Sequence, residues 1–138
     1  MLRLALTCAL AVATASAVRG ETLTPGSYEV VVQLDLPFVE TTNTRKTERI
    51  CLASETALAV LSDNNPLGKC PSSNMARQGS DLTFDIKCEG TNAAQGHARY
   101  TLTAETFDGL IEMKMGGKNM TMSETQHGRR VGECAPRS

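Results

Sequence analysis

Two Met-x-Met pairs are the residues whose type and spacing most readily suggest chemistry in this sequence. Met113 and Met115 come just before residues 116–119, and Met120 and Met122 come just after them. If residues 116–119 form the loop of a β-hairpin, Met115 faces Met120 and Met113 faces Met122, so that all four side chains emerge on one face. Thioethers are soft ligands that suit Cu(I) or Ag(I), and the hairpin is therefore a candidate metal site.

An apolar role for the same methionines is the interpretation that we favour. Their face of the hairpin continues through Phe107 and Ile111, and Met commonly fills irregular cores and adaptable ligand pockets. The open alternatives are a metal site, to which His97 or His127 would add a nitrogen, and an apolar contact surface. The candidate ligand-binding residues are Met113, Met115, Met120, Met122, Phe107 and Ile111.

The cysteines point to covalent stapling of the fold. If residues 78–80 form a three-residue hairpin loop, Cys70 faces Cys88 across two strands, where their β-carbons are close enough to bridge. This ranks Cys70–Cys88 with Cys51–Cys134 first among the three possible connectivities of four cysteines. The sequence has no C-x-x-C motif and no closely spaced Cys/His pair, which disfavours zinc and thioredoxin-type sites.

The histidines and the acidic residues form no recognisable catalytic arrangement. His97 lies at a strand start and His127 in a polar stretch, and we expect both to be ordinary solvated side chains. The sequence contains no G-x-S-x-G or H-E-x-x-H motif. We therefore predict a protein that is not an enzyme and uses no cofactor.

The start of the chain predicts export. Residues 1–17 contain one positive charge, a short apolar run that includes Cys8, and a small-residue end, which is the pattern of a secretory signal peptide. Cleavage after residue 17 removes Cys8, and cleavage after residue 20 is the alternative. This apolar run is too short to span a membrane, and no later stretch approaches the length of a membrane helix, so we predict a periplasmic protein without a membrane span.

Length and charge limit the remaining possibilities. A chain of 138 residues suits one domain, here residues 21–138, and not two independent cores. The 14 Lys and Arg residues are balanced by 15 Asp and Glu residues, for a net charge of −1, which argues against binding to nucleic acid. The sequence does not indicate the oligomeric state.

Hydrophobic alternation predicts the strands that must position these residues. Residues 26–37 and 81–88 alternate between apolar and polar side chains, as strands with one buried face do. Arg45, Lys46 and Arg49 lie in a polar stretch at 43–51, where we expect an exposed edge strand. Further strands are expected over residues 97–103 and 107–115 and from residue 120 towards residue 134.

A mainly β fold follows from these elements. About seven antiparallel strands in a meander form a curled sheet, a sandwich or a lipocalin-like barrel. Ser54 is expected to cap one short helix over residues 55–61, and two disulfides complete the fold.

Several short motifs in this order resemble a known family. They are Pro25-Gly26-Ser27-Tyr28-Glu29-Val30, Arg49-Ile50-Cys51-Leu52, the Cys70/Cys88 pair, the two Met-x-Met pairs, and residues 128–134. Together they resemble DUF3617, a bacterial family of small exported proteins of unknown function. The resemblance implies export to the bacterial envelope and a β-rich domain, and it implies no reaction.

We therefore expect an exported, soluble β protein without catalytic activity. Its leading expected function is binding of a small apolar ligand or an envelope partner through the methionine face. Cu(I) or Ag(I) binding by the Met-x-Met pairs is one alternative. The other is a structural or interaction module that uses the edge strand around residues 42–49.

Overall fold

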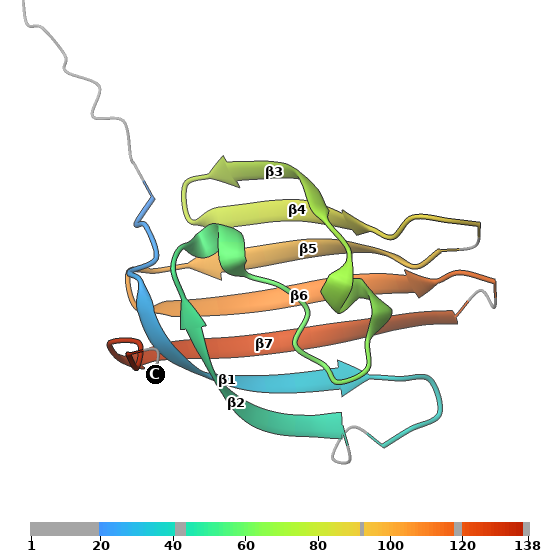
Figure 1. The fold of residues 1–138 in the computed structure, drawn as a ribbon, viewed down its shortest axis with the longest axis horizontal. Helices are drawn as coiled ribbons and strands as arrows, with labels where there is room; N and C mark the ends of the chain where they lie inside the picture. The colour runs from blue at the N-terminus through green and yellow to red at the C-terminus, as the bar shows by residue number, and fades with distance from the viewer. Residues whose placement is uncertain (1–19, 41–43, 92, 118–119, 137–138) are drawn as a thin grey trace, which may run out of the picture.

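Seven strands form one antiparallel sheet in the computed structural model, which describes residues 20–40, 44–91, 93–117 and 120–136. The order across the sheet is β2-β1-β7-β6-β5-β4-β3, so β2 and β3 are its edges (Figure 1). The predicted signal peptide lies outside the described residues, as do residues 118–119 of the predicted hairpin loop. The strands are β1 (Gly26–Asp35), β2 (Arg45–Leu52), β3 (Ser72–Gln78), β4 (Asp81–Lys87), β5 (Gln95–Leu102), β6 (Thr106–Met115) and β7 (Met120–Gly132).

The predicted mainly β class is confirmed, and of the three forms considered the sheet takes the curled, unclosed one. The helix predicted over residues 55–61 is only a single 3-10 turn, η2 (Glu55–Ala57), and Ser54 makes no side-chain capping bond. A second 3-10 turn, η3, covers Pro66–Lys69. Isolated segments of about seven residues are too short to stabilise an α-helix, because nucleation is unfavourable. Neither helical turn in the described residues is long and apolar enough to cross a membrane.

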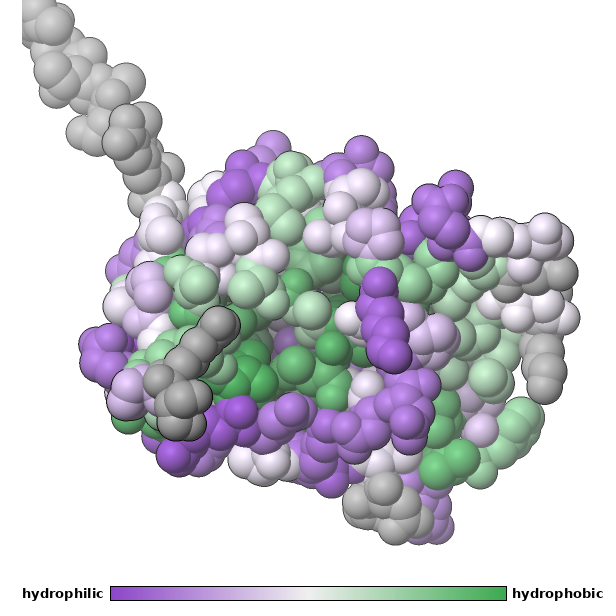
Figure 2. Space-filling view, in the orientation of Figure 1, coloured by the Kyte–Doolittle hydropathy of each residue, from purple (hydrophilic) through white to green (hydrophobic). Residues whose placement is uncertain are grey.

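One face of the sheet, called the inner face below, carries the core. Buried and exposed positions alternate along β1, β4, β5 and β6 as a period of two requires. Residues 53–71, called the covering segment, connect β2 to β3 and lie across this face (Figure 1). Leu58, Val60 and Leu67 of the covering segment are buried in the core. Figure 2, seen from this side, shows apolar side chains over much of its middle, bordered by hydrophilic ones.

Four of the five aromatic residues line up across the inner face. Ring centroids lie 5.7 Å apart for Tyr28 and Phe107, 5.9 Å for Phe107 and Tyr100, and 5.8 Å for Tyr100 and Phe84. Phe107 covers Gly128, its cross-strand neighbour, so closely that a β-carbon there would lie 2.3 Å from the ring. A glycine is therefore required at this position for the aromatic row to pack.

Both predicted disulfides are confirmed, with Cα–Cα distances of 5.5 Å for Cys51–Cys134 and 5.0 Å for Cys70–Cys88. Cys51 lies just before the covering segment and Cys70 lies near its end. The two disulfides therefore fasten both ends of the segment to the sheet, one to the carboxyl-terminal end of the chain and the other to the end of β4.

The loop that led to the Cys70–Cys88 prediction is one residue shorter than expected. Gln78 pairs with Asp81, which leaves a two-residue loop instead of the predicted three-residue loop. The register then shifts between Ser73 and Ala76, where Asn74 adopts a φ of 53°, a value that Asn tolerates better than most residues. This β-bulge inserts one residue and restores the register that brings the two cysteines together.

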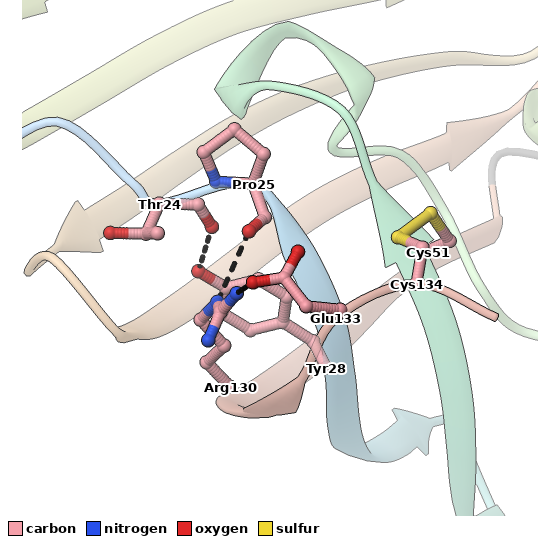
Figure 3. Close-up of a disulfide and its surroundings, with 7 residues drawn as sticks. All are labelled: Thr24, Pro25, Tyr28, Cys51, Arg130, Glu133 and Cys134. Atoms are coloured by element: carbon pink, nitrogen blue, oxygen red, sulfur yellow. Dashed lines mark hydrogen bonds and ion pairs between the residues drawn. A yellow bond between two sulfur atoms is a disulfide. The ribbon is translucent and has the colours of Figure 1, made fainter.

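The first strand and the end of the last strand are held together next to the Cys51–Cys134 disulfide (Figure 3). The Tyr28 hydroxyl donates to the Thr24 carbonyl over 2.5 Å. Arg130 donates to the Pro25 carbonyl over 3.1 Å and forms an ion pair with Glu133 over 2.7 Å. These contacts fix the amino-terminal end of β1, where the strand enters the core.

Candidate functional site

The methionine hairpin has the predicted register. Met115 pairs with Met120 and Met113 pairs with Met122 between β6 and β7. Met113 is only 3% exposed, Met115 and Met122 are half-buried against the core, and Met120 is 38% exposed. The four side chains therefore share the inner face but range from buried to open.

Most of the candidate apolar face is part of the filled core. Phe107 and Ile111 are almost fully buried in it. Asn65 of the covering segment donates a hydrogen bond from Nδ2 to the sulfur of Met113 over 3.2 Å. The covering segment thus occupies the space above Met113 that a ligand of the methionine face would need.

Two buried polar residues on β7 were missed by the sequence reasoning. Glu124 and Gln126 are fully buried on the inner face. The Glu124 carboxylate accepts the backbone N–H groups of Leu61 over 2.8 Å and Ser62 over 3.0 Å. Gln126 donates to the Ala59 carbonyl over 2.8 Å and to Glu124 over 2.6 Å. The alternation of β7 could have shown that these two residues face the core, since positions 120, 122, 124, 126 and 128 share one face.

Tyr100 extends this buried network. Its hydroxyl donates to Oε1 of Gln126 over 2.9 Å. Burial strongly raises the pKa of Tyr100, and the nearby Glu124 raises it further. The side chains of the network bind backbone groups of the covering segment, and they therefore hold the segment on the sheet.

The opposite face of the sheet, called the outer face, contains a hollow of about 860 Å³. Two rows of cross-strand neighbours line it. The basic row consists of Lys87, Gln95, Lys114 and Thr121, and the acidic row consists of Asp85, His97, Glu112 and Ser123, with Asp35 beyond Ser123 on β1.

The floor of the hollow is the main chain between these two rows. Four residues between the rows also border the hollow: Ile86, Gly96, Met113 and Met122. Side chains at these strand positions point to the inner face, so the residues border the hollow with their main chain. The methionine side chains and the hollow are therefore on opposite sides of the sheet.

A histidine in the acidic row is held by a carboxylate. Nδ1 of His97 lies 2.6 Å from Oδ1 of Asp85, and Nδ2 of Asn74 donates to Oδ2 of Asp85 over 2.9 Å. These hydrogen bonds from His97 and Asn74 hold the pKa of Asp85 below its usual range. Since the carboxylate takes Nδ1, the Nε2 atom of His97 remains available to a ligand.

The two lysines of the basic row are available as well. Among the described residues, neither Lys87 nor Lys114 has an ion-pair partner, whereas Lys46 pairs with Asp63 and Arg77 with Glu55. Both lysines also border a neighbouring hollow of about 360 Å³. The alternation of residues 81–88 placed Lys87 on the solvent face but gave no sign that a hollow lies there.

Other charged residues of the outer face pair with one another. His127 contacts Asp108, and Arg129 contacts Glu29 over 3.0 Å.

The predicted edge strand is confirmed, because β2 lies at one side of the sheet. Within the described part of the chain, no group of three or more His, Cys, Asp or Glu side chains could hold a metal ion.

Comparison with known proteins identifies a family but no characterised relative. No curated protein and no solved structure gave a significant match to the chain. The model of a family described as protein of unknown function, DUF3617, matches residues 23–134. This match includes all seven strands, the covering segment and both disulfides, and the chain therefore belongs to the DUF3617 family.

Proposed function

We propose that the protein is a non-catalytic binding protein that takes a small polar ligand in the outer-face hollow. The observation that carries this proposal is the contrast between the two faces. The inner face is filled by the covering segment, whereas the outer face has a hollow of about 860 Å³ with two lysines that have no ion-pair partner in the described part of the chain. A concave site with a few convergent polar groups is the usual form of a small-molecule site.

Binding is favoured over catalysis by the surroundings of His97. Asp85 orients its ring, as in many catalytic pairs. Among the described residues, however, no hydroxyl or thiol is hydrogen-bonded to His97, and the four described cysteines are all in disulfides. The pair is thus suited to offering a hydrogen bond rather than to activating a nucleophile.

The position of the methionines makes an apolar ligand or a Cu(I) ion the weaker choice. Met113 is enclosed and its sulfur already accepts a hydrogen bond from Asn65. A soft metal ion would have to displace that bond and part of the covering segment. For this reason the outer-face hollow replaces the methionine face as the proposed ligand site.

A second candidate function is interaction with a partner protein at the β1–β2 turn. Phe38 is fully exposed and Val39 is 44% exposed, and Figure 2 shows apolar side chains at the end of the sheet where this turn emerges. Phe is one of the residue types that are enriched at the centre of protein interfaces. Loss of a co-purifying partner on Phe38→Ser, with unchanged thermal stability, would support this candidate.

We also propose that the protein works in the periplasm. The signal pattern of residues 1–17 supports export, and two disulfides are typical of proteins in oxidising compartments. Cell fractionation combined with mass spectrometry of the amino terminus tests this: a periplasmic form lacking residues 1–17 or 1–20 is expected. A cytoplasmic full-length form with free thiols would contradict it.

NMR titration tests the binding proposal directly. Isotope-labelled protein is titrated with a panel of amino acids, short peptides, carboxylates, amines and inorganic phosphate. We expect the panel to contain compounds that shift the side-chain amide signal of Gln95 and the ring signals of His97. The effect is lost in the Lys87→Gln/Lys114→Gln double variant and retained in the Lys69→Gln control, since Lys69 is exposed and lies outside the hollow.

The proposal fails if no compound shifts these signals. It also fails if the shifts are confined to the methionine hairpin and the covering segment, because the ligand would then occupy the inner face.

A further inference from the structure

Charge in the outer-face hollow is separated into two parallel rows. Lys87 on β4 and Lys114 on β6 belong to the basic row, with Gln95 of β5 between them. Asp85 and Glu112 lie two residues from these lysines on the same strands, in the acidic row. Residues two apart in a strand point to the same face about 7 Å apart. A ligand on the floor of the hollow therefore touches cations along one side and carboxylates along the other.

The groups that remain available differ between the rows. Both lysines lack ion-pair partners among the described residues. In the acidic row, Asp85 is engaged by Asn74 and His97. Among the residues that the structure describes, Glu112 forms one long ion pair, with Arg99 at 3.7 Å. The free charges that face a ligand are thus two ammonium groups and, in the acidic row, the carboxylates of Glu112 and of Asp35, which accepts one hydrogen bond from Gln33.

The lysines are placed to converge on one anionic group. They lie two strand spacings apart, which is about 10 Å between their backbones, and each has a long flexible side chain. Gln95 and Thr121 of the same row add a side-chain amide and a hydroxyl. A carboxylate bound above Gln95 is therefore within reach of both ammonium groups and one amide donor.

From this arrangement we propose that the ligand is a zwitterion of dipeptide size. Its carboxylate lies on the basic row and its ammonium group lies about 7 Å away, beside Glu112 of the acidic row. A simple anion would meet the carboxylates of Asp35, Asp85 and Glu112 in the same hollow, and a simple cation would meet the two lysines. Only a ligand with both charges is complementary to both rows.

The size of the hollow agrees with this ligand. About 860 Å³ of space exceeds the needs of a single ion. A second hollow of about 360 Å³ shares Lys87, Gln95 and Lys114 with it. The floor belongs to strands β4 to β7, which are already paired on both sides. A peptide therefore binds through its charged ends and not by adding a strand to the sheet.

Three related probes test the charge requirement: L-alanyl-L-alanine, its N-acetyl derivative and its carboxamide. The N-acetyl derivative lacks the positive charge, and the carboxamide lacks the negative one. Binding of each to the whole mature protein is measured by isothermal titration and by the NMR signals of Gln95 and His97. We expect the dipeptide to bind, and each blocked form to bind about two- to fivefold more weakly, as loss of one partly exposed ion pair implies.

Variants assign each end of the dipeptide to its row. Glu112→Gln is expected to lower the affinity for the dipeptide to about that of the unchanged protein for the N-acetyl form. The affinity of Glu112→Gln for the N-acetyl form itself does not fall. Lys87→Gln/Lys114→Gln weakens the dipeptide and leaves the carboxamide unaffected. Lys69→Gln changes none of the three affinities, because Lys69 lies on η3, away from the hollow.

This inference rests on the proposed function, and the outcomes separate the two. Equal affinity of the dipeptide and the N-acetyl form at these residues would overturn the zwitterion but leave ligand binding in the hollow intact. Absence of dipeptide binding, while another compound of the panel shifts Gln95 and His97, would do the same. If neither the dipeptide nor any panel compound shifts these signals, both proposals fail.

Discussion

Replacing Glu124 by alanine tests whether the buried network holds the covering segment in place. The Glu124 side chain is fully buried and accepts three hydrogen bonds, from Leu61, Ser62 and Gln126. Its removal leaves three donors without their acceptor, one of them buried and two partly buried. A buried donor left unsatisfied costs about 1–3 kcal/mol, so Glu124→Ala should lower the free energy of unfolding by about 4 kcal/mol after partial relaxation.

Two smaller changes calibrate this value. Glu124→Gln keeps the size of the side chain but sets an amide NH2 group against one of the donors, which predicts a loss of about 1–2 kcal/mol. Glu105→Ala removes an exposed carboxylate and should stay within about 0.5 kcal/mol of the unchanged protein. Urea denaturation followed by tyrosine fluorescence is suitable, since the protein contains no Trp.

Hydrogen exchange locates the effect in the structure. In Glu124→Ala the amide protons of Leu61 and Ser62 should exchange faster than in the unchanged protein by more than the change in global stability explains, because they lose their acceptor. If Glu124→Ala were no more destabilising than Glu105→Ala, or if the protection of these two amides were unchanged, the reasoning about the network would be refuted.

Three further predictions concern the disulfides, the aromatic row and the acidic row. Replacing both Cys70 and Cys88 by serine should lower the free energy of unfolding by about 3 kcal/mol, and replacing both Cys51 and Cys134 should lower it by about 4.5 kcal/mol. The second loss is larger because Cys51–Cys134 closes a loop of 83 residues against 18, and longer loops lose more chain entropy when closed. Urea denaturation measures both losses. Gly128→Ala should destabilise by about 1–3 kcal/mol, because its β-carbon would overlap the Phe107 ring, and thermal unfolding detects this. The folded-state pKa of Asp85 lies below its usual range, so its stabilising effect is complete above pH of about 4 and disappears as the pH falls through the folded pKa; carbon-13 NMR of the carboxyl group follows this titration.

Each of these predictions has its own control. For the disulfides, unequal losses in the reverse order would contradict the loop-length argument. Gly68→Ala introduces a β-carbon with nothing nearer than 4.0 Å, and an equal loss at Gly68 and Gly128 would show that ring contact is not the cause. Asn74→Ala removes one hydrogen bond to Asp85 and should raise its pKa, and an unchanged titration would count against the assigned cause.

The sheet could be predicted from the sequence where alternation was strict. The period-two pattern around Phe84 and Tyr100 assigned the inner face correctly, and pairing of Met113 with Met122 followed from one loop length. The Cys70–Cys88 disulfide was also predicted, although the bulge at Asn74 was needed to compensate for the shorter loop. A register error of one residue turns every side chain of a strand to the other face of the sheet. Here the shorter loop and the bulge shift the register in opposite directions, so the side chains before the bulge keep their predicted neighbours.

The candidate site could not be predicted in the same way. Alternation places Lys114 on the outer face but does not tell whether that face is flat or hollow, since curvature is a property of the whole sheet. Glu124 follows the apolar phase of β7, yet polar type alone suggested a solvated stretch. The covering segment was missed because its residues have no periodic pattern, and its place over Met113 depends on long-range hydrogen bonds.

Methyl groups on the two faces of the sheet show on which face a ligand binds. Thr121 lines the outer-face hollow, whereas Met113, Met115 and Met122 pack on the inner face. With methyl-labelled Thr and Met, a ligand bound as proposed gives intermolecular nuclear Overhauser effects to the Thr121 methyl group and none to these three methionines. Contacts to the methionine methyls without contact to Thr121 would show that the ligand binds on the inner face and not in the outer-face hollow.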